Sequence, residues 1–223
     1  MNKSIIVAID EVNFEEFNFI LKSLDNKKCM VKIGSVSFNA LGRETVISAA
    51  NKGFDVFLDL KLHDIPNTVE RSIKGLISLP IKMMTVHASG GIEMLKVAKN
   101  AVKGTDIEIF AVTALTSLSD KDTFQISQRT AAEQVNAMIN LADEAGIDGV
   151  VCSPHEIELV HARKTLQSIT PGIRLSKSAD DQTRVMTPKE AILKGANYIV
   201  IGRPITNAPN ISEALTKIFN SIQ

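Results

Sequence analysis

The chain has 223 residues, of which 44% are hydrophobic and 22% are charged, and its 25 lysines and arginines balance its 25 aspartates and glutamates. This length suits one domain with a sizeable core and leaves little room for a second. The balanced charge offers no basic surface for nucleic acid or for an anionic membrane, so any bound anion must be held locally.

The first apolar run, Ile5–Ile9, follows Lys3 and stops at Asp10. It is shorter than the ~7–15 apolar residues of a secretory signal, and no stretch approaches the ~18 residues of a membrane-spanning helix. The two cysteines, Cys29 and Cys152, lie far apart in apolar surroundings and match no metal or redox spacing. We therefore expect a cytoplasmic protein with two reduced core thiols.

Eight short apolar runs alternate with amphipathic segments along the chain. Many of the runs are β-branched and lack polar alternation, which is typical of parallel strands covered on both faces. The expected strands are Ile5–Ile9, Cys29–Ile33, Phe54–Leu60, Lys82–His87, Ile107–Val112, Gly149–Cys152, Ser168–Thr170 and Tyr198–Ile201.

Apolar residues between several of these strands fall at helical spacing. The four clearest sets are Phe14, Phe17, Ile20, Leu21 and Leu24; Val69, Ile73, Leu76 and Ile77; Ala132, Val135, Ile139 and Ala142; and Ile211, Ala214, Leu215 and Ile218. Eight strands, each followed by a helix or a helix-like stretch, predict an α/β protein with a single (β/α)8 TIM-barrel domain over residues 1–223. A doubly wound open sheet is the main alternative, but its G-x-G-x-x-G fingerprint is absent.

Polar residues gather where the expected strands end, which is where barrels carry their chemistry. Asp59 and Lys61 of the third strand are two residues apart and should point to the same face. The structural explanation is a buried ion pair, with Asp64 as an exposed helix N-cap. Asp10 at the end of strand one and Lys32 in strand two favour a functional explanation, because alternating charges in one cleft are typical of active sites.

The eighth expected strand ends in Gly202-Arg203-Pro204. In barrels the loops after strands seven and eight often bind phosphate. Gly202 would let a backbone N–H approach a phosphate oxygen, and Arg203 would add bidentate hydrogen bonds; the alternative is a surface turn with a solvated arginine. The long polar segment 171–188 lacks helical periodicity, and its place beside this site indicates a lid.

These residues resemble the orotidine 5′-phosphate decarboxylase family over nearly the whole chain. The Asp-x-Lys-x-x-Asp pattern is shared with related sugar-phosphate enzymes, whereas its Ile-Pro-Asn-Thr continuation and the Asp-Gln-x-Arg segment are far more specific. The matching segments are Val7-Ala8-Ile9-Asp10, Val31-Lys32-Ile33-Gly34, Asp59-x-Lys61-x-x-Asp64-Ile65-Pro66-Asn67-Thr68, Leu115-Thr116-Ser117, Pro171-Gly172-Ile173-Arg174, Asp181-Gln182-x-Arg184 and Ile201-Gly202-Arg203-Pro204.

The resemblance implies a dimeric barrel, without cofactor or metal, that converts orotidine 5′-phosphate to UMP and CO2 in pyrimidine synthesis. It implies that Lys61 donates a proton to C6, that Asp59 sits against the substrate carboxylate and that Lys32 orders the charge array. Asp64 and Thr68 would reach the neighbouring subunit's site. The implied substrate contacts are Asp10 and Lys32 at the ribose, Thr116 (or Ser117) at the pyrimidine, Gln182 between phosphate and base, and Gly202, Arg203 and Arg174 at the phosphate.

Two other functions remain open. A related Mg²⁺-dependent sugar-phosphate decarboxylase or aldolase would need carboxylates around the ion, whereas strand two offers Lys32. A non-catalytic phosphate-binding module would have no reason to hold Asp59, Lys61 and Asp64 together. His87, at the end of strand four, is interpreted as a core histidine rather than as part of the site wall.

Overall fold

The structure, a computed structural model, describes residues 3–174 and 186–223 of the chain. Eight parallel strands pair in chain order, and β1 pairs with β8 to close a barrel. This confirms the predicted TIM barrel and excludes the open sheet. The strands are β1 (Ile5–Ile9), β2 (Met30–Gly34), β3 (Val56–Leu62), β4 (Met83–His87), β5 (Glu108–Val112), β6 (Gly149–Val151), β7 (Gln167–Thr170) and β8 (Tyr198–Ile201).

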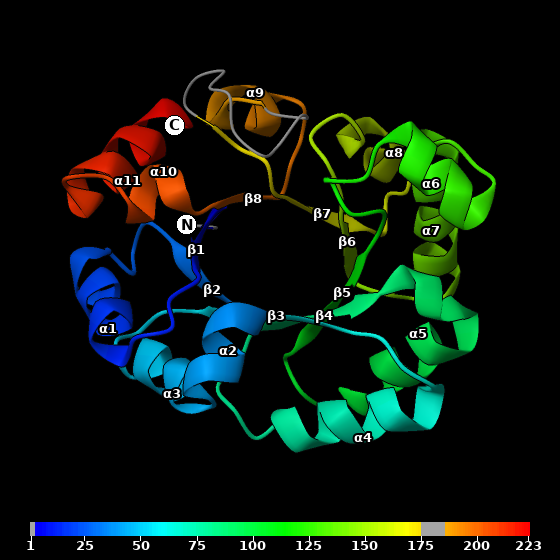
Figure 1. The fold of residues 1–223 in the computed structure, drawn as a ribbon, viewed down its shortest axis with the longest axis horizontal. Coiled ribbons are helices and arrows are strands. Elements are labelled where there is room, and N and C mark those ends of the chain that lie inside the picture. The colour runs from blue at the N-terminus through cyan, green and yellow to red at the C-terminus, as the bar shows by residue number, and fades with distance from the viewer. Residues whose placement is uncertain (1–2, 175–185) are drawn as a thin grey trace.

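Helices form a ring around the strands (Figure 1). The four sets of helically spaced residues correspond to α1, α4, α7 and α11, with Leu24 and Ile77 at the C-caps of α1 and α4. In α7, Ala131 rather than Ala132 lies on the buried face. The helices are α1 (Phe14–Ser23), α2 (Ser35–Leu41), α3 (Glu44–Asn51), α4 (Pro66–Leu76), α5 (Gly91–Ala101), α6 (Asp120–Ser127), α7 (Ala131–Glu144), α8 (Ile157–His161), α9 (Pro188–Leu193), α10 (Arg203–Thr206) and α11 (Ile211–Ser221), with a 3-10 turn, η1, at Ala88–Gly90.

Local side chains explain where several helices begin. Asn13 precedes α1, and its side-chain oxygen accepts hydrogen bonds from the N–H groups of Glu15 and Glu16 at 2.8 and 3.1 Å. Thr130 and Glu133 form a reciprocal capping box at the start of α7. Such caps satisfy backbone donors that the first helical turn leaves unpaired.

The largest boundary difference concerns the third strand, expected at Phe54–Leu60 and found two residues later. The N–H of Phe54 donates to Ala49 O at 3.2 Å, which closes the end of α3 and keeps Phe54 out of the ladder. At the other end, Leu62 pairs with Val86 of β4, so β3 continues past Leu60. The end of α3 therefore decides where β3 can begin, and pairing with β4, which the local pattern does not contain, decides where it ends.

Two apolar layers explain why the strands are hydrophobic on both faces. Inside the barrel, Phe57, Phe110 and Tyr198 meet edge to face, with ring centroids 6.4 and 6.3 Å apart. A larger layer lies between strands and helices and includes the free, buried Cys29 and Cys152, as expected for core thiols. Burial raises the pKa of Cys29 to about 12, so this thiol is unreactive.

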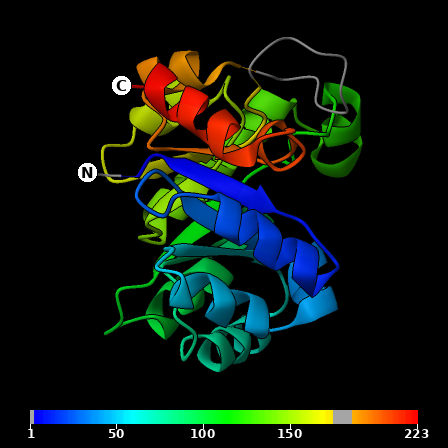
Figure 2. The ribbon, with the colours of Figure 1, turned by 90° about the vertical axis from the view of Figure 1, so that its left-hand side faces the viewer.

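Parallel strands bring all their carboxyl ends to one mouth of the barrel. Figure 2 shows the β1 arrow pointing toward one end of the barrel, while the two chain termini lie near the other. Most of the segment expected as a lid, including Gln182, lies outside the described residues. Within residues 3–174 and 186–223, no helix is long and apolar enough to cross a membrane.

Candidate active site

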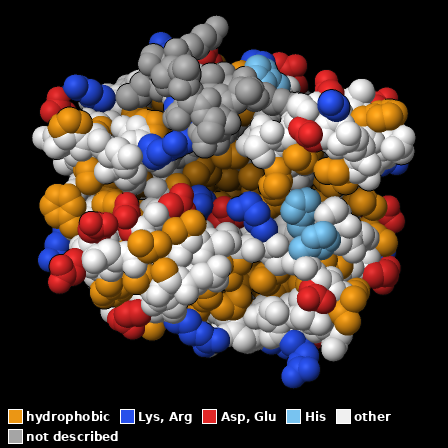
Figure 3. All heavy atoms as spheres, viewed as in Figure 1, with side chains coloured by type: hydrophobic (Ala, Val, Ile, Leu, Met, Phe, Trp, Pro, Cys, Tyr) orange, Lys and Arg blue, Asp and Glu red, His pale blue; other side chains and the backbone are white. Residues whose placement is uncertain are grey.

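The mouth of the barrel contains a cavity of about 300 Å³. Its centre brings charged and apolar side chains together in one hollow (Figure 3). The apolar part of the wall comes from β1, β3, β5, β6, β7 and β8, so it can accept a flat ring. The predicted site residues that line the cavity are Asp10, Lys32, Asp59, Lys61, Thr116, Arg174, Gly202 and Arg203.

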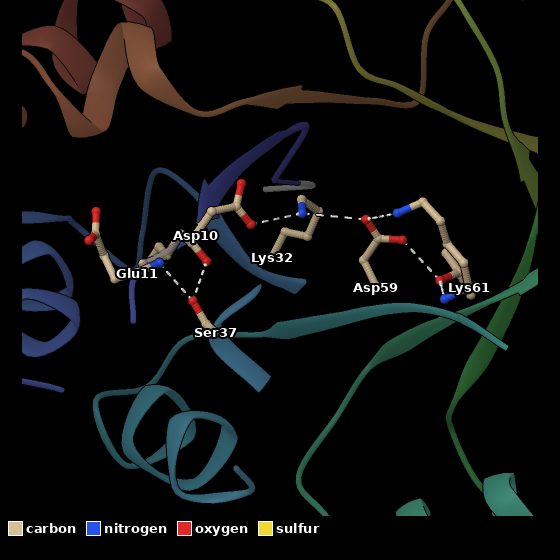
Figure 4. A network of polar contacts seen from close by, with 8 residues as sticks. Asp10, Glu11, Lys32, Ser37, Asp59 and Lys61 are labelled. Carbon is tan, nitrogen blue, oxygen red and sulfur yellow. Dashed lines mark hydrogen bonds and ion pairs between the residues drawn. The ribbon is translucent and has the colours of Figure 1, made fainter. Parts of the chain in front are cut away.

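Four of these side chains form a row of alternating charge (Figure 4). Lys32 Nζ lies 3.6 Å from Asp10 Oδ1 and 3.4 Å from Asp59 Oδ2, and Lys61 Nζ lies 2.8 Å from the same Asp59 oxygen. We call Asp10, Lys32, Asp59 and Lys61 the charge array. The Asp59 and Lys32 side chains are only 10% and 13% exposed, whereas Lys61 is 38% exposed.

The barrel register explains how the charge array assembles. Lys32 pairs with Ala8 on one side and with Phe57 on the other, and Gly34 pairs with Asp59. A Cβ atom at Gly34 would come within 2.9 Å of Lys32 Nζ and 3.1 Å of Asp10 Oδ1. A side chain at position 34 would displace the Lys32 ammonium from Asp10, so glycine at this position favours the ion pair.

Lys61 has an uncommon backbone conformation, with a positive φ of 51°. Between the pairs Leu58↔Met84 and Leu62↔Val86 the β3–β4 register shifts, so β3 carries a bulge around Lys61. Bulges re-aim side chains, and a left-handed non-glycine residue costs about 1–3 kcal/mol. The prediction that Lys61 and Asp59 share a face is confirmed by their contact, but simple strand alternation does not produce it.

The charge array keeps Asp59 ionised. Burial raises the pKa of Asp59, but Lys32, Lys61 and hydrogen bonds from Lys61 and Thr85 together hold it below its ordinary value. The site therefore presents the Lys61 ammonium group fixed against the Asp59 carboxylate in the lining of the cavity.

Ser37 is a site residue that sequence reasoning missed. Its hydroxyl is fully buried, donates to Ile9 O at 3.0 Å and accepts from the Glu11 N–H at 2.8 Å. These bonds fix the backbone on both sides of Asp10 (Figure 4). Nothing near Ser37 in the sequence marks this role, because it depends on β1 and β2 being neighbours.

Two arginines, Arg174 and Arg203, line the part of the cavity next to β7 and β8. Gly202 and Arg203 follow β8, and Arg174 follows β7. Arg174 is buried, and its guanidinium donates to Ile173 O at 3.1 Å. A Cβ at Gly202 would sit 3.5 Å from Ala8 Cβ, an ordinary contact, so the protein's own packing does not require glycine there.

Asp64 and Thr68 do not join the cavity. Both are exposed at the start of α4. Asp64 Oδ1 accepts from the Ile65 N–H at 2.7 Å, and Asp64 forms no ion pair with the described residues. The N-cap of α4 is Ile65, so the alternative of Asp64 as the cap is wrong.

His87 is half-buried rather than a core residue, so that interpretation is wrong. Its ring stacks on His63 at 5.2 Å, and its Nδ1 lies 2.6 Å from Ser89 Oγ. Burial, then His63 and Lys61, hold the pKa of His87 below its ordinary value. Within the described residues, no cluster of three or more His, Cys, Asp or Glu side chains is placed to hold a metal ion.

Comparisons with known proteins agree with this geometry. Residues 3–218 match the family model described as "Orotidine 5'-phosphate decarboxylase / HUMPS family". The chain is 44% identical to the orotidine 5′-phosphate decarboxylase of Pasteurella multocida, covering 100% of this chain and 98% of the relative. It is 45% identical to that of Actinobacillus pleuropneumoniae serotype 5b, covering 100% of both.

A solved structure gives the same result in three dimensions. The crystal structure of orotidine 5′-phosphate decarboxylase from Lactobacillus acidophilus superposes with a TM-score of 0.87 at 37% identity, covering 99% of each chain. An uncharacterized conserved protein from Geobacillus kaustophilus superposes with a TM-score of 0.84 at 31% identity.

Proposed function

The chain belongs to the orotidine 5′-phosphate decarboxylase / HUMPS family and decarboxylates orotidine 5′-phosphate to UMP and CO2, and we propose that Lys61 is its proton donor. The enzyme is thus a carboxy-lyase of pyrimidine biosynthesis. The observation that carries the role of Lys61 is its ammonium group, held 2.8 Å from Asp59 at the floor of the cavity.

The chemistry needs a cation at this place. When the C6–CO2 bond breaks, its electron pair stays on C6, where no adjacent carbonyl can take the charge. The Lys61 ammonium stabilises that charge as it develops and then transfers a proton from Nζ to C6; water afterwards returns a proton to the amine. Asp59, ionised beside it, would lie against the departing carboxylate.

The other site residues would contact different parts of the substrate along the cavity. Asp10 and Lys32, at one end of the charge array, would hold the ribose hydroxyls, and Thr116 would contact the pyrimidine. Gly202, Arg203 and Arg174 would bind the phosphate, because guanidinium groups donate paired hydrogen bonds to its oxygens. Phosphate binding far from the reacting bond supplies energy that lowers the barrier at C6.

We also propose a homodimer in which Asp64 and Thr68 complete the neighbouring subunit's site. Both side chains are exposed and lie outside their own cavity. Ile65, between them, is 65% exposed, as expected of an apolar residue that a second copy covers.

The Mg²⁺-dependent alternative fits the site poorly, because Lys32 Nζ lies between the two carboxylates, Asp10 and Asp59, that would have to hold the ion. We expect enzyme treated with EDTA to convert orotidine 5′-phosphate to UMP at the rate of untreated enzyme, measured by ultraviolet absorbance. Loss of activity with EDTA and recovery with Mg²⁺ would contradict this proposal.

The phosphate role of Arg203 is tested by comparing two substrates. Arg203→Ala should lower kcat/KM for orotidine 5′-phosphate. The corresponding loss of transition-state stabilisation should be about 1.5–3 kcal/mol, the range for a hydrogen bond to a charged group. The loss should nearly vanish with orotidine, the phosphate-free nucleoside. An equal loss on both substrates would show that Arg203 does not act through the phosphate.

A further inference from the structure

Thr85, on β4, is a buried polar residue that the reaction scheme leaves unused. It lies in an otherwise apolar part of the strand between Met84 and Val86, with no exposed surface. A buried hydroxyl is costly unless it is hydrogen-bonded. In a barrel strand of this composition valine would fill the same space, so the hydroxyl has to be explained by what it contacts.

Both hydrogen bonds of this hydroxyl go to the charge array. Thr85 Oγ1 donates to Asp59 Oδ1 at 2.9 Å and accepts from the Lys61 N–H at 2.8 Å. The hydroxyl therefore links the side chain of one site residue to the backbone of the other. It also leaves Asp59 Oδ2 as the oxygen that faces both ammonium groups.

The bulge in β3 explains why a hydroxyl is needed there. The register passes from Leu58↔Met84 to Leu62↔Val86, so Thr85 faces a longer stretch of β3 than a regular ladder allows. At this bulge the Lys61 N–H donates to the Thr85 hydroxyl, which takes the place of a ladder carbonyl. The hydroxyl satisfies this donor and supports the strained conformation that aims Lys61.

We propose that Thr85 is a positioning residue for decarboxylation: its hydroxyl holds the Lys61 backbone in the left-handed conformation and fixes the orientation of the Asp59 carboxylate. The inference rests on the proposed roles of Asp59 and Lys61. Thr85 is not among the residues that line the cavity, so its removal should affect the reacting geometry more than substrate binding.

Thr85→Val, which keeps the shape and removes the hydroxyl, is the main test. We expect kcat for orotidine 5′-phosphate to fall about 10- to 100-fold, as for the loss of two buried hydrogen bonds, one of them to a charged group. KM and the dissociation constant of UMP should change little. Thr85→Ser, which restores the hydroxyl, should recover most of kcat.

The pH profile separates positioning from a general loss of structure. The charged groups that face Asp59 are Lys32 from β2 and Lys61 from β3, with Asp10 beyond Lys32. Lys61 in turn lowers the pKa of His87 of β4. All of these charged and titratable groups remain in the Thr85 variants. Without the Thr85 donor the pKa of Asp59 rises, so the acid limb of kcat should move to higher pH in Thr85→Val and return in Thr85→Ser.

Thr85→Ala is the second variant if the added methyl group of valine prevents folding; the same fall in kcat is expected. A folded Thr85→Val or Thr85→Ala enzyme with wild-type kcat and acid limb would overturn the inference. So would a folded Thr85→Ser enzyme as impaired as Thr85→Val. Failure of the wild-type enzyme to convert orotidine 5′-phosphate would instead overturn the proposed function, which keeps the two outcomes distinct.

Discussion

Lys61→Ala should lower kcat for orotidine 5′-phosphate by a factor on the order of 10⁴ or more. The substitution removes both the cation that stabilises charge at C6 and the proton that C6 receives, and each effect alone is worth about 10²- to 10³-fold or more. The measurement is the ultraviolet change on conversion to UMP, run at high enzyme concentration so that a residual rate is detected.

Two controls make the Lys61→Ala result specific. Lys217→Ala removes an exposed lysine of α11, 70% exposed, and should leave the rate unchanged. The dissociation constant of UMP measures whether the Lys61 variant keeps an intact site, since ribose and phosphate contacts come from other residues. A Lys61→Ala enzyme that binds UMP and retains more than about a tenth of wild-type kcat would exclude Lys61 as the proton donor.

Asp59→Asn should produce the second large loss, in stability as well as in rate. The substitution leaves the Lys32 and Lys61 ammonium groups 3.4 and 2.8 Å from a neutral amide. Removing one partner of a buried pair costs about 3–5 kcal/mol, and we expect the lower end because Lys61 is 38% exposed. Urea unfolding at neutral pH measures this cost, and decarboxylation should fall by at least about 100-fold.

The stability difference between wild type and Asp59→Asn should depend on pH in one direction. The folded-state pKa of Asp59 is depressed, so its ionisation stabilises the fold fully above the unfolded pKa, about 3.9. The stabilisation by ionised Asp59 is lost as the pH falls from the unfolded pKa through the lower folded-state pKa. The two unfolding free energies should therefore converge below about pH 4. A constant difference from neutral to acid pH would show that Asp59 charge does not stabilise the fold.

The sequence by itself determined the barrel and the charged residues of the cavity's lining. Apolar strands alternating with amphipathic helices have few other ways to bury both faces of each strand. Because parallel strands deliver their carboxyl ends to one mouth, Asp10, Lys32, Asp59 and Arg203 could be placed in one cavity from their positions along the chain alone.

Only the tertiary structure decided how these residues are held. The bulge at Lys61, the hydroxyl of Thr85 and the space left by Gly34 all depend on contacts between neighbouring strands. Ser37 reaches Ile9 and Glu11 across 28 and 26 residues of sequence. A local pattern reports which face a side chain occupies but not which atoms oppose it, because register and bulges are fixed by pairing between distant segments.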